Sequence, residues 1–174
     1  MALAIGDALA AVWIEREQIS RVDFATNHPA GNLGKKLTLK TKDLMIPYDK
    51  IKFLTPELGI LQIIEFLTRD GIGACCVFDN LKAKNLIGLI TDGDLRRALK
   101  ENKSEKWSEL KAKNLMSNDP IIINEEVLAI DALKLMENNR KKSISILPVL
   151  DKDSKFLGLL RLHDLIQSGL KNIK

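Results

Sequence analysis

Apolar and polar positions along this chain follow one pattern that occurs twice. Each copy has an apolar run of strand length, a segment with apolar residues at helical spacing, two further strand-like runs joined by a polar turn, and a second helical segment. In the first copy these elements are expected at 51–54, 55–70, 74–78, 86–90 and 92–100. In the second copy the strands are expected at 121–123, 144–150 and 156–160. The pattern therefore predicts a β-α-β-β-α unit present twice in an α/β (α+β) fold.

The two copies are most alike where the last strand passes into the last helix. Residues 88–94 read Gly-Leu-Ile-Thr-Asp-Gly-Asp, and residues 158–164 read Gly-Leu-Leu-Arg-Leu-His-Asp. A Leu-Met pair stands ahead of each copy, at 44–45 and at 115–116. A repeat of this length marks a whole supersecondary unit. The division that we expect is an N-terminal part, 1–40, followed by two related domains, 43–102 and 114–174.

Residue types at the predicted helix starts support these assignments. Thr55, which is followed by proline and glutamate, is expected to cap the first helix, and Thr91 is expected to cap the closing helix of the same copy. Asn124 is the expected cap in the second copy. The stripes that we expect to be buried are Leu58, Leu61, Ile64 and Leu67 in the first copy and Val127, Ile130, Leu133 and Met136 in the second.

The N-terminal part begins with a predicted helix over 3–17. Its apolar and small residues suit close packing against another helix, yet no partner for it is evident within the chain. Ser20 and Asp23 have capping-box spacing and predict the start of a short second helix. Proline and two glycines within residues 27–34 then predict an irregular loop that contains His28.

The composition is that of a globular protein, with 174 residues of which 45% are hydrophobic and 29% are charged. The formal charge of +4 is thinly spread. Its densest basic clusters, 35–36 and 140–142, are not interleaved with aromatic residues, so we predict no nucleic-acid partner. No apolar run approaches the roughly 18 residues of a membrane span, and no basic leader follows Met1. We therefore predict no membrane association and a cytoplasmic location.

The two cysteines, Cys75 and Cys76, are adjacent within a predicted strand. Strand alternation directs their side chains to opposite faces of the sheet, so a disulfide between them is not expected. Free cysteine is among the most often buried residue types, and other metal ligands do not surround this pair. We predict two buried thiols, no metal site and no resident cofactor.

The repeated unit, with a strand that ends in Gly-apolar-apolar-Thr-x-x-Asp and passes into a helix, resembles the CBS (cystathionine beta-synthase type) domain. Two such units resemble a CBS pair, and the resemblance covers the chain from about Asp43 onward. It implies a regulatory module with a nucleotide-sensing site in the cleft between the repeats.

Three stretches are similar to the C-terminal half of the bacterial arabinose-5-phosphate isomerases. They are the Thr-Asp-Gly-Asp-Leu-Arg-Arg phrase at 91–97, the His-Pro-Ala-Gly loop at 28–31, and residues 3–10. In that family a sugar isomerase (SIS) domain precedes the CBS pair, so residues 1–40 resemble the tail of an SIS domain. The family interconverts D-arabinose 5-phosphate and D-ribulose 5-phosphate for the synthesis of Kdo, a sugar of lipopolysaccharide.

The resemblance also assigns candidate roles to five side chains. It makes His28 a catalytic residue of the isomerase, in an active site shared between subunits. It places Thr91 on a ligand phosphate and Asp94 on ribose hydroxyls, and in the second copy it places Asp164 with Arg161, which replaces the threonine. Arg161 could pair with phosphate or fill its own pocket. Without a ligand, the threonine and both aspartates are also ordinary helix-capping residues, and His28 an ordinary turn residue.

Three hypotheses of function stay open. The first is a regulatory CBS pair of an arabinose-5-phosphate isomerase that senses a nucleotide, a sugar nucleotide or a sugar phosphate. The second is a stand-alone CBS adaptor that binds an adenine nucleotide or regulates a partner enzyme. The third is catalysis by this chain itself, for which His28 lacks the acid-base partners and phosphate loop that the chemistry needs. We expect the chain alone to be inactive, and we expect it to self-associate as a dimer or tetramer.

Overall fold

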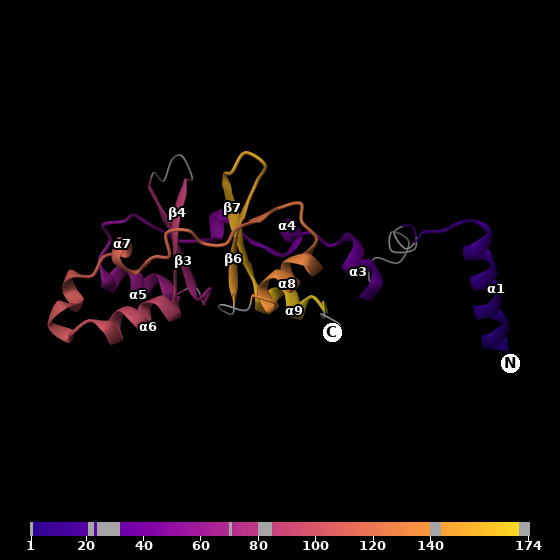
Figure 1. Ribbon diagram of the computed structural model, residues 1–174, viewed down its shortest axis with the longest axis horizontal. Helices are drawn as coiled ribbons and strands as arrows, with labels where there is room; N and C mark the ends of the chain where they lie inside the picture. The colour runs from indigo at the N-terminus through magenta and orange to yellow at the C-terminus, as the bar shows by residue number, and fades with distance from the viewer. Residues whose placement is uncertain are drawn as a thin grey trace.

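The structure is a computed structural model that describes residues 2–20, 23, 32–69, 71–79, 85–139 and 144–170. The two repeats lie side by side, each with a sheet and helices packed against it, and helix α1 (Ala2–Arg16) lies apart from them (Figure 1). The fold class predicted from the pattern is confirmed. Helix α3 (Asn32–Thr38) leads from the N-terminal part into the repeats. Ser20 and Asp23 form their predicted capping box, with the Ser20 backbone N–H and hydroxyl both donating to the Asp23 carboxylate at 3.0 and 2.6 Å.

Each repeat contains the predicted unit together with a short leading helix. The first comprises α4 (Thr41–Leu44), β1 (Ile46–Pro47), the 3-10 turn η1 (Tyr48–Lys50), β2 (Phe53–Leu54), α5 (Ile60–Arg69), β3 (Ala74–Phe78), β4 (Leu86–Thr91) and α6 (Asp92–Glu101). A 3-10 turn, η2 (Ser104–Glu109), connects it to the second, which comprises α7 (Ala112–Leu115), β5 (Ile123–Asn124), α8 (Ala129–Glu137), β6 (Ile146–Leu150), β7 (Phe156–Arg161) and α9 (Leu162–Gln167).

The repeats exchange their leading strands, a feature that the sequence pattern did not predict. Strand β1 of the first repeat pairs antiparallel with β7 of the second, so that one sheet has the order β1-β7-β6-β5 and the other β2-β3-β4. In the second repeat, Ser117 occupies the place equivalent to β1 and forms an antiparallel bridge with Leu89 of β4. Each repeat is therefore completed by a segment that belongs in sequence to the other.

This exchange explains why the two repeated phrases both begin with glycine. A Cβ added to Gly158 would overlap the backbone carbonyl oxygen of Ile46, which crosses directly over it. A Cβ added to Gly88 would lie 2.5 Å from the Sδ atom of Met116. The glycines and the Leu-Met pairs, which the sequence places far apart, thus meet across the boundary between the repeats.

Two helices begin at other residues than the sequence predicted. Helix α5 begins at Ile60 rather than at Thr55, and α8 begins at Ala129 rather than at Asn124, so both cap predictions are wrong. The first helical N–H groups are satisfied from the other part of the chain: Ile60 donates to the Leu110 carbonyl at 3.0 Å, and Ala129 donates to the Leu39 carbonyl at 2.8 Å. Because these carbonyls come from tertiary contacts, local residue type does not indicate the boundary.

The buried stripe of α5 also differs from the prediction. Leu61 is 77% exposed, whereas Ile60, Ile63 and Leu67 are buried. Residues 60, 63 and 67 share a helix face, whereas Leu61 is turned away from Ile60 by about 100° around the helix axis. In α8 the predicted Ile130, Leu133 and Met136 are all buried, together with two alanines. Val127 is half-buried and precedes the helix.

The core has three parts: one within each repeat and one between the two sheets. Cys75 belongs to the core of the first repeat and Cys76 to the central part, which confirms that neighbouring side chains of β3 point to opposite faces. Rings from both repeats meet edge to face in the central part, where the ring centroids of Phe78 and Phe156 lie 5.3 Å apart. No helix within the described ranges has the length and apolar character needed to cross a membrane.

Candidate ligand site between the repeats

The first predicted site lies where β4 passes into α6. Thr91 is the N-cap residue of α6, as predicted, and its backbone N–H donates to the Asp94 carboxylate at 2.9 Å. Its hydroxyl donates to the same carboxylate at 2.6 Å, and Arg97 forms an ion pair with the other oxygen. Asp94 is only 7% exposed. Both predicted ligand-binding side chains therefore complete a helix cap, which the neighbouring arginine neutralises.

The second predicted site has a different arrangement at the equivalent position. Arg161 donates two hydrogen bonds to Asp164, from Nε and from one of its terminal nitrogens, both at 2.7 Å. Its other terminal nitrogen donates to the backbone carbonyl of Gly71 in the first repeat at 3.3 Å. The Asp164 carboxylate raises the pKa of Arg161 above its ordinary value. Arg161 therefore contacts both repeats through one side chain.

The structure places the two sites on different cavities. Asp94 and Arg97 line a cleft of about 440 Å³ that lies between α6, η2 and α7 and also holds Glu101, Lys106 and Glu109. Arg161 lines a cavity of about 630 Å³ whose walls come from both repeats: residues 71–73 of the first, and Ser145, Ile146, residues 161–163 and Ile166 of the second. The predicted residues are therefore not brought together in one pocket.

The larger cavity has the chemical character of a site for an anion with an apolar part. Arg161 and His163 are the basic side chains among its described lining residues, which include no carboxylate. Ile72, Ile146 and Leu162 supply apolar surface. Such a cavity can pair a phosphate with the guanidinium and bury a ring against the aliphatic side chains.

Some of these lining residues were not predicted from the sequence. Ala74, the first residue of β3, pairs with Thr91, the last residue of β4, and Ile146 of β6 pairs with Arg161 of β7 in the same way. Gly73 and Ser145, which precede β3 and β6, therefore lie close to the ends of β4 and β7. The internal repeat itself contained this signal, because Gly73 and Ser145 occupy equivalent places. His28, the predicted catalytic residue, lies outside the described residues. No cluster of three or more potential metal ligands is present among those described.

Two β-α-β-β-α units that exchange their leading segments form the fold of a tandem CBS domain pair. The CBS domain family matches residues 42–101 and 112–171, and the chain belongs to this family.

Relatives with longer chains match nearly all of this one. Arabinose 5-phosphate isomerase KdsD of Francisella tularensis is 36% identical over 170 residues, which is 97% of this chain and 49% of that protein. The protein of the same name in Pseudomonas aeruginosa is 34% identical over 168 residues, again 97% of this chain and 49% of the relative. The chain thus spans about half the length of the curated relatives that it matches.

Solved structures share the fold at low sequence identity. A CBS domain-containing protein of unknown function from Bacillus anthracis has a TM-score of 0.63 and 22% identity, and the match covers 75% of this chain and 91% of that one. The complex of CBSX2 with AMP has a TM-score of 0.61 and 21% identity, with 75% and 96% covered. The CBS domain of a bacterial CNNM/CorC family Mg²⁺ transporter in complex with ATP has a TM-score of 0.65 and 15% identity, with 78% and 89% covered.

Proposed function

We propose that this chain is the regulatory CBS pair of an arabinose 5-phosphate isomerase and that it senses a nucleotide or sugar nucleotide in the cavity between the repeats. The observation that carries the proposal is the placement of Arg161, a cation on the wall of a cavity lined by residues of both repeats. The AMP and ATP complexes of CBS proteins with this fold support the ligand class. Relatives called KdsD support the connection with the isomerase and its Kdo pathway. A cytoplasmic location, where a sugar-phosphate substrate is found, is part of the proposal.

Helix α1 supports the assignment of residues 1–40 to the tail of an SIS domain. Ile5, Leu9, Val12 and Trp13 are between 57% and 66% exposed, and their i, i+4, i+7, i+8 spacing places them on one face of the helix. An exposed apolar helix face of this kind is normally buried against another element, as it would be within a larger domain. The same exposed surface supports self-association as a dimer or tetramer, which light scattering at micromolar concentration measures.

Calorimetric titration of the chain with AMP, ATP and CMP-Kdo tests the ligand part of the proposal. Replacement of Arg161 by alanine removes a charged hydrogen-bond donor, and we expect the affinity to fall by about 10- to 100-fold. Because the attraction between Arg161 and phosphate is ionic, the affinity of the parent chain decreases as salt increases. Arg96→Ala is the matched control, since Arg96 is an exposed arginine on α6 that lines neither cavity and bonds only to the Asp92 carbonyl of its own helix among the described contacts.

The variants distinguish the two predicted sites. If Asp94→Ala loses binding while Arg161→Ala retains it, the ligand lies at the α6 cleft and Arg161 has no role in sensing. If none of the three ligands binds, the ligand part of the proposal fails and the aspartates serve as helix caps alone. Binding of AMP and ATP without any response to CMP-Kdo favours the second function, an adenine-nucleotide adaptor.

A catalytic role of His28 is part of the proposed isomerase assignment, in an active site shared between subunits. General acid-base chemistry needs partners within hydrogen-bond reach of the same substrate. We therefore expect the isolated 174-residue chain not to convert arabinose 5-phosphate to ribulose 5-phosphate. Turnover that disappears in His28→Ala would contradict this expectation.

A further inference from the structure

Residues 32–44 comprise helix α3, a connector and the leading helix α4 of the first repeat, and they are attached to the second repeat. The Leu39 carbonyl accepts a hydrogen bond from the first N–H of α8, and the Thr41 N–H donates to the Val127 carbonyl at 2.9 Å. The Thr41 side chain is fully buried, and its hydroxyl lies 2.7 Å from the carbonyl oxygens of Asn124 and Glu125. Leu39 and Leu44 pack against the core of the second repeat.

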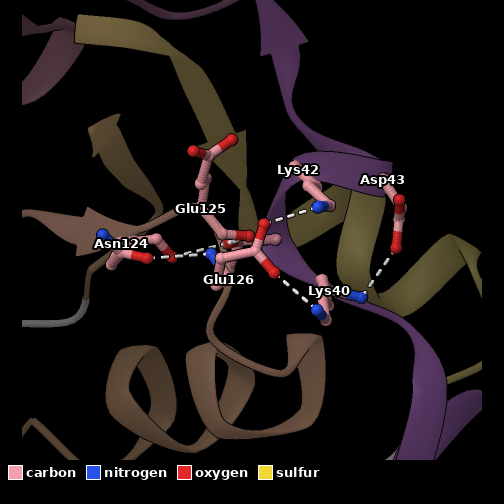
Figure 2. Close-up of polar contacts among 7 residues, drawn as sticks. Lys40, Lys42, Asp43, Asn124, Glu125 and Glu126 are labelled. Carbon is pink, nitrogen blue, oxygen red and sulfur yellow. Dashed lines mark hydrogen bonds and ion pairs between the residues drawn. The ribbon is translucent and has the colours of Figure 1, made fainter. Parts of the chain in front are cut away.

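Two lysines and one glutamate reinforce this attachment (Figure 2). Lys40 and Lys42 each contact one oxygen of the Glu126 carboxylate, at 2.5 Å. The Lys40 backbone N–H also donates to Asp43, which orders the turn that presents both ammonium groups. These contacts lower the pKa of Glu126 from its ordinary 4.5 to about 2. The carboxylate is thus charged at neutral pH and is shared by two residues of the incoming segment.

Helix α3 is attached to the same repeat at a second point. The Lys35 ammonium donates to the Ser168 carbonyl at 2.7 Å, at the C-terminal end of α9. Unpaired carbonyls at a helix end favour a cation there. Residues 32–44 therefore contact the start of α8 and the end of α9, the two helices of the second repeat that follow β5 and β7.

The chain contains an equivalent attachment in the opposite direction, in which lysines of the second repeat contact a glutamate of the first. Lys111 and Lys113, at the start of the leading helix α7 of the second repeat, each contact Glu57 of the first repeat at 2.6 Å. The Ala112 N–H donates to the Leu58 carbonyl at 2.8 Å, as Thr41 does to Val127. This second clamp holds the connector between the repeats, whereas the clamp at Glu126 holds the segment that leads to the N-terminal part.

We infer that residues 32–44 form a coupling segment that transmits the state of the second repeat, rather than the first, to the N-terminal part of the protein. This inference rests on the proposed ligand cavity, since Arg161 and residues 145–146 of that cavity belong to the repeat that holds the segment. A ligand that repositions α9 moves the Ser168 carbonyl to which Lys35 is bonded, and α9 packs against α8, whose first N–H is bonded to Leu39. The side-chain hydrogen bonds and ion pairs described above for residues 35–42 lead to the second repeat.

Hydrogen exchange of the whole chain, followed by mass spectrometry, tests the coupling segment without and with a ligand. Without ligand, Glu126→Lys places three cations together, and we expect exchange over 32–44 to accelerate about tenfold. The matched variant Glu57→Lys accelerates exchange over 110–116 and changes 32–44 by less than about twofold. Combining Glu126→Lys with Lys40→Glu and Lys42→Glu restores opposite charges, and we expect slow exchange to return. This result would show that Glu126→Lys acts by breaking the ion pairs and not by a general loss of folding.

With saturating AMP, exchange over 32–44 slows in the parent chain, and this response is lost in Glu126→Lys while the affinity for AMP is unchanged. Equal effects of the two glutamate variants on 32–44 overturn the inference. Binding of AMP without any response at 32–44 also overturns it, but leaves the proposed function standing. If AMP does not bind, nucleotide sensing fails, and the exchange of the ligand-free variants alone decides whether the second repeat holds the segment.

Discussion

Strand β1 lies so close to Gly158 that the two repeated glycines should differ in how well they tolerate a side chain. A pair of alanine substitutions measures the difference. At Gly158 the added methyl group meets the Ile46 carbonyl oxygen, which belongs to the β1 backbone and is held by the pairing of Ile46 with Leu159. At Gly88 the methyl group meets the side chain of Met116, which can rotate away. Gly158→Ala must displace a strand, and Gly88→Ala must displace a flexible side chain.

The magnitudes follow from the cost of overpacking. Inserting a methyl group into a packed site costs about 1–3 kcal/mol, and we place Gly158→Ala at about 3 kcal/mol and Gly88→Ala at about 1 kcal/mol. Replacing glycine also restricts the unfolded chain, which offsets about 0.4–1 kcal/mol in both variants. For a protein of this size, 1 kcal/mol corresponds to about 2–4 °C in Tm. Gly158→Ala is therefore expected to lower Tm by about 4–10 °C, and Gly88→Ala by no more than about 2 °C.

Urea unfolding followed by far-ultraviolet circular dichroism gives the two free energies of unfolding. Truncation of Met116 to alanine is expected to relieve part of the cost of Gly88→Ala, so the two changes should couple by about 0.5 kcal/mol or more. Truncation of Met45 should not rescue Gly158→Ala, because the obstruction there is a backbone carbonyl. Equal losses at the two glycines, or a loss below about 1 kcal/mol at Gly158, would refute the reasoning.

Three further predictions concern single side chains. Asp94→Asn weakens the α6 cap and leaves Arg97 without its partner, so the free energy of unfolding falls by about 1–3 kcal/mol in urea titrations; an unchanged midpoint would contradict the described cap. Lys111 and Lys113 hold the pKa of Glu57 at about 2 rather than 4.5, as Lys40 and Lys42 do for Glu126. The stability from both clamps is therefore complete above about pH 4.5 and is lost as pH falls toward 2, and the double variant Glu57→Gln/Glu126→Gln should flatten this acid limb of the Tm profile. Ile63→Ala should cost about 2–5 kcal/mol and Leu61→Ala less than about 0.5 kcal/mol, whereas the predicted stripe implied the reverse order.

Many residues of the candidate site could be predicted from local sequence, but the contacts that these residues make between the repeats could not. Thr91 as an N-cap with a carboxylate three residues later is a signal within one turn of chain, and the structure has that cap. Arg161 and Asp164 have the same spacing, and they form a bidentate pair that the sequence did not predict. The contact of Arg161 with Gly71 joins residues that are 90 positions apart, and no local pattern indicates it.

The sequence by itself determined the α/β class, the double β-α-β-β-α order and most strands. It also determined the start of α6 and the opposite faces of the two cysteines. Each of these features depends on periodicity or on hydrogen bonds within a few residues. Only the tertiary structure decided which strand completes which sheet, where α5 and α8 begin, which face of α5 is buried, and which repeat holds residues 32–44. The physical reason is shared by all four. The N–H groups and apolar faces concerned are satisfied by carbonyls and side chains from the other repeat, and either repeat's sequence alone contains only one side of each contact.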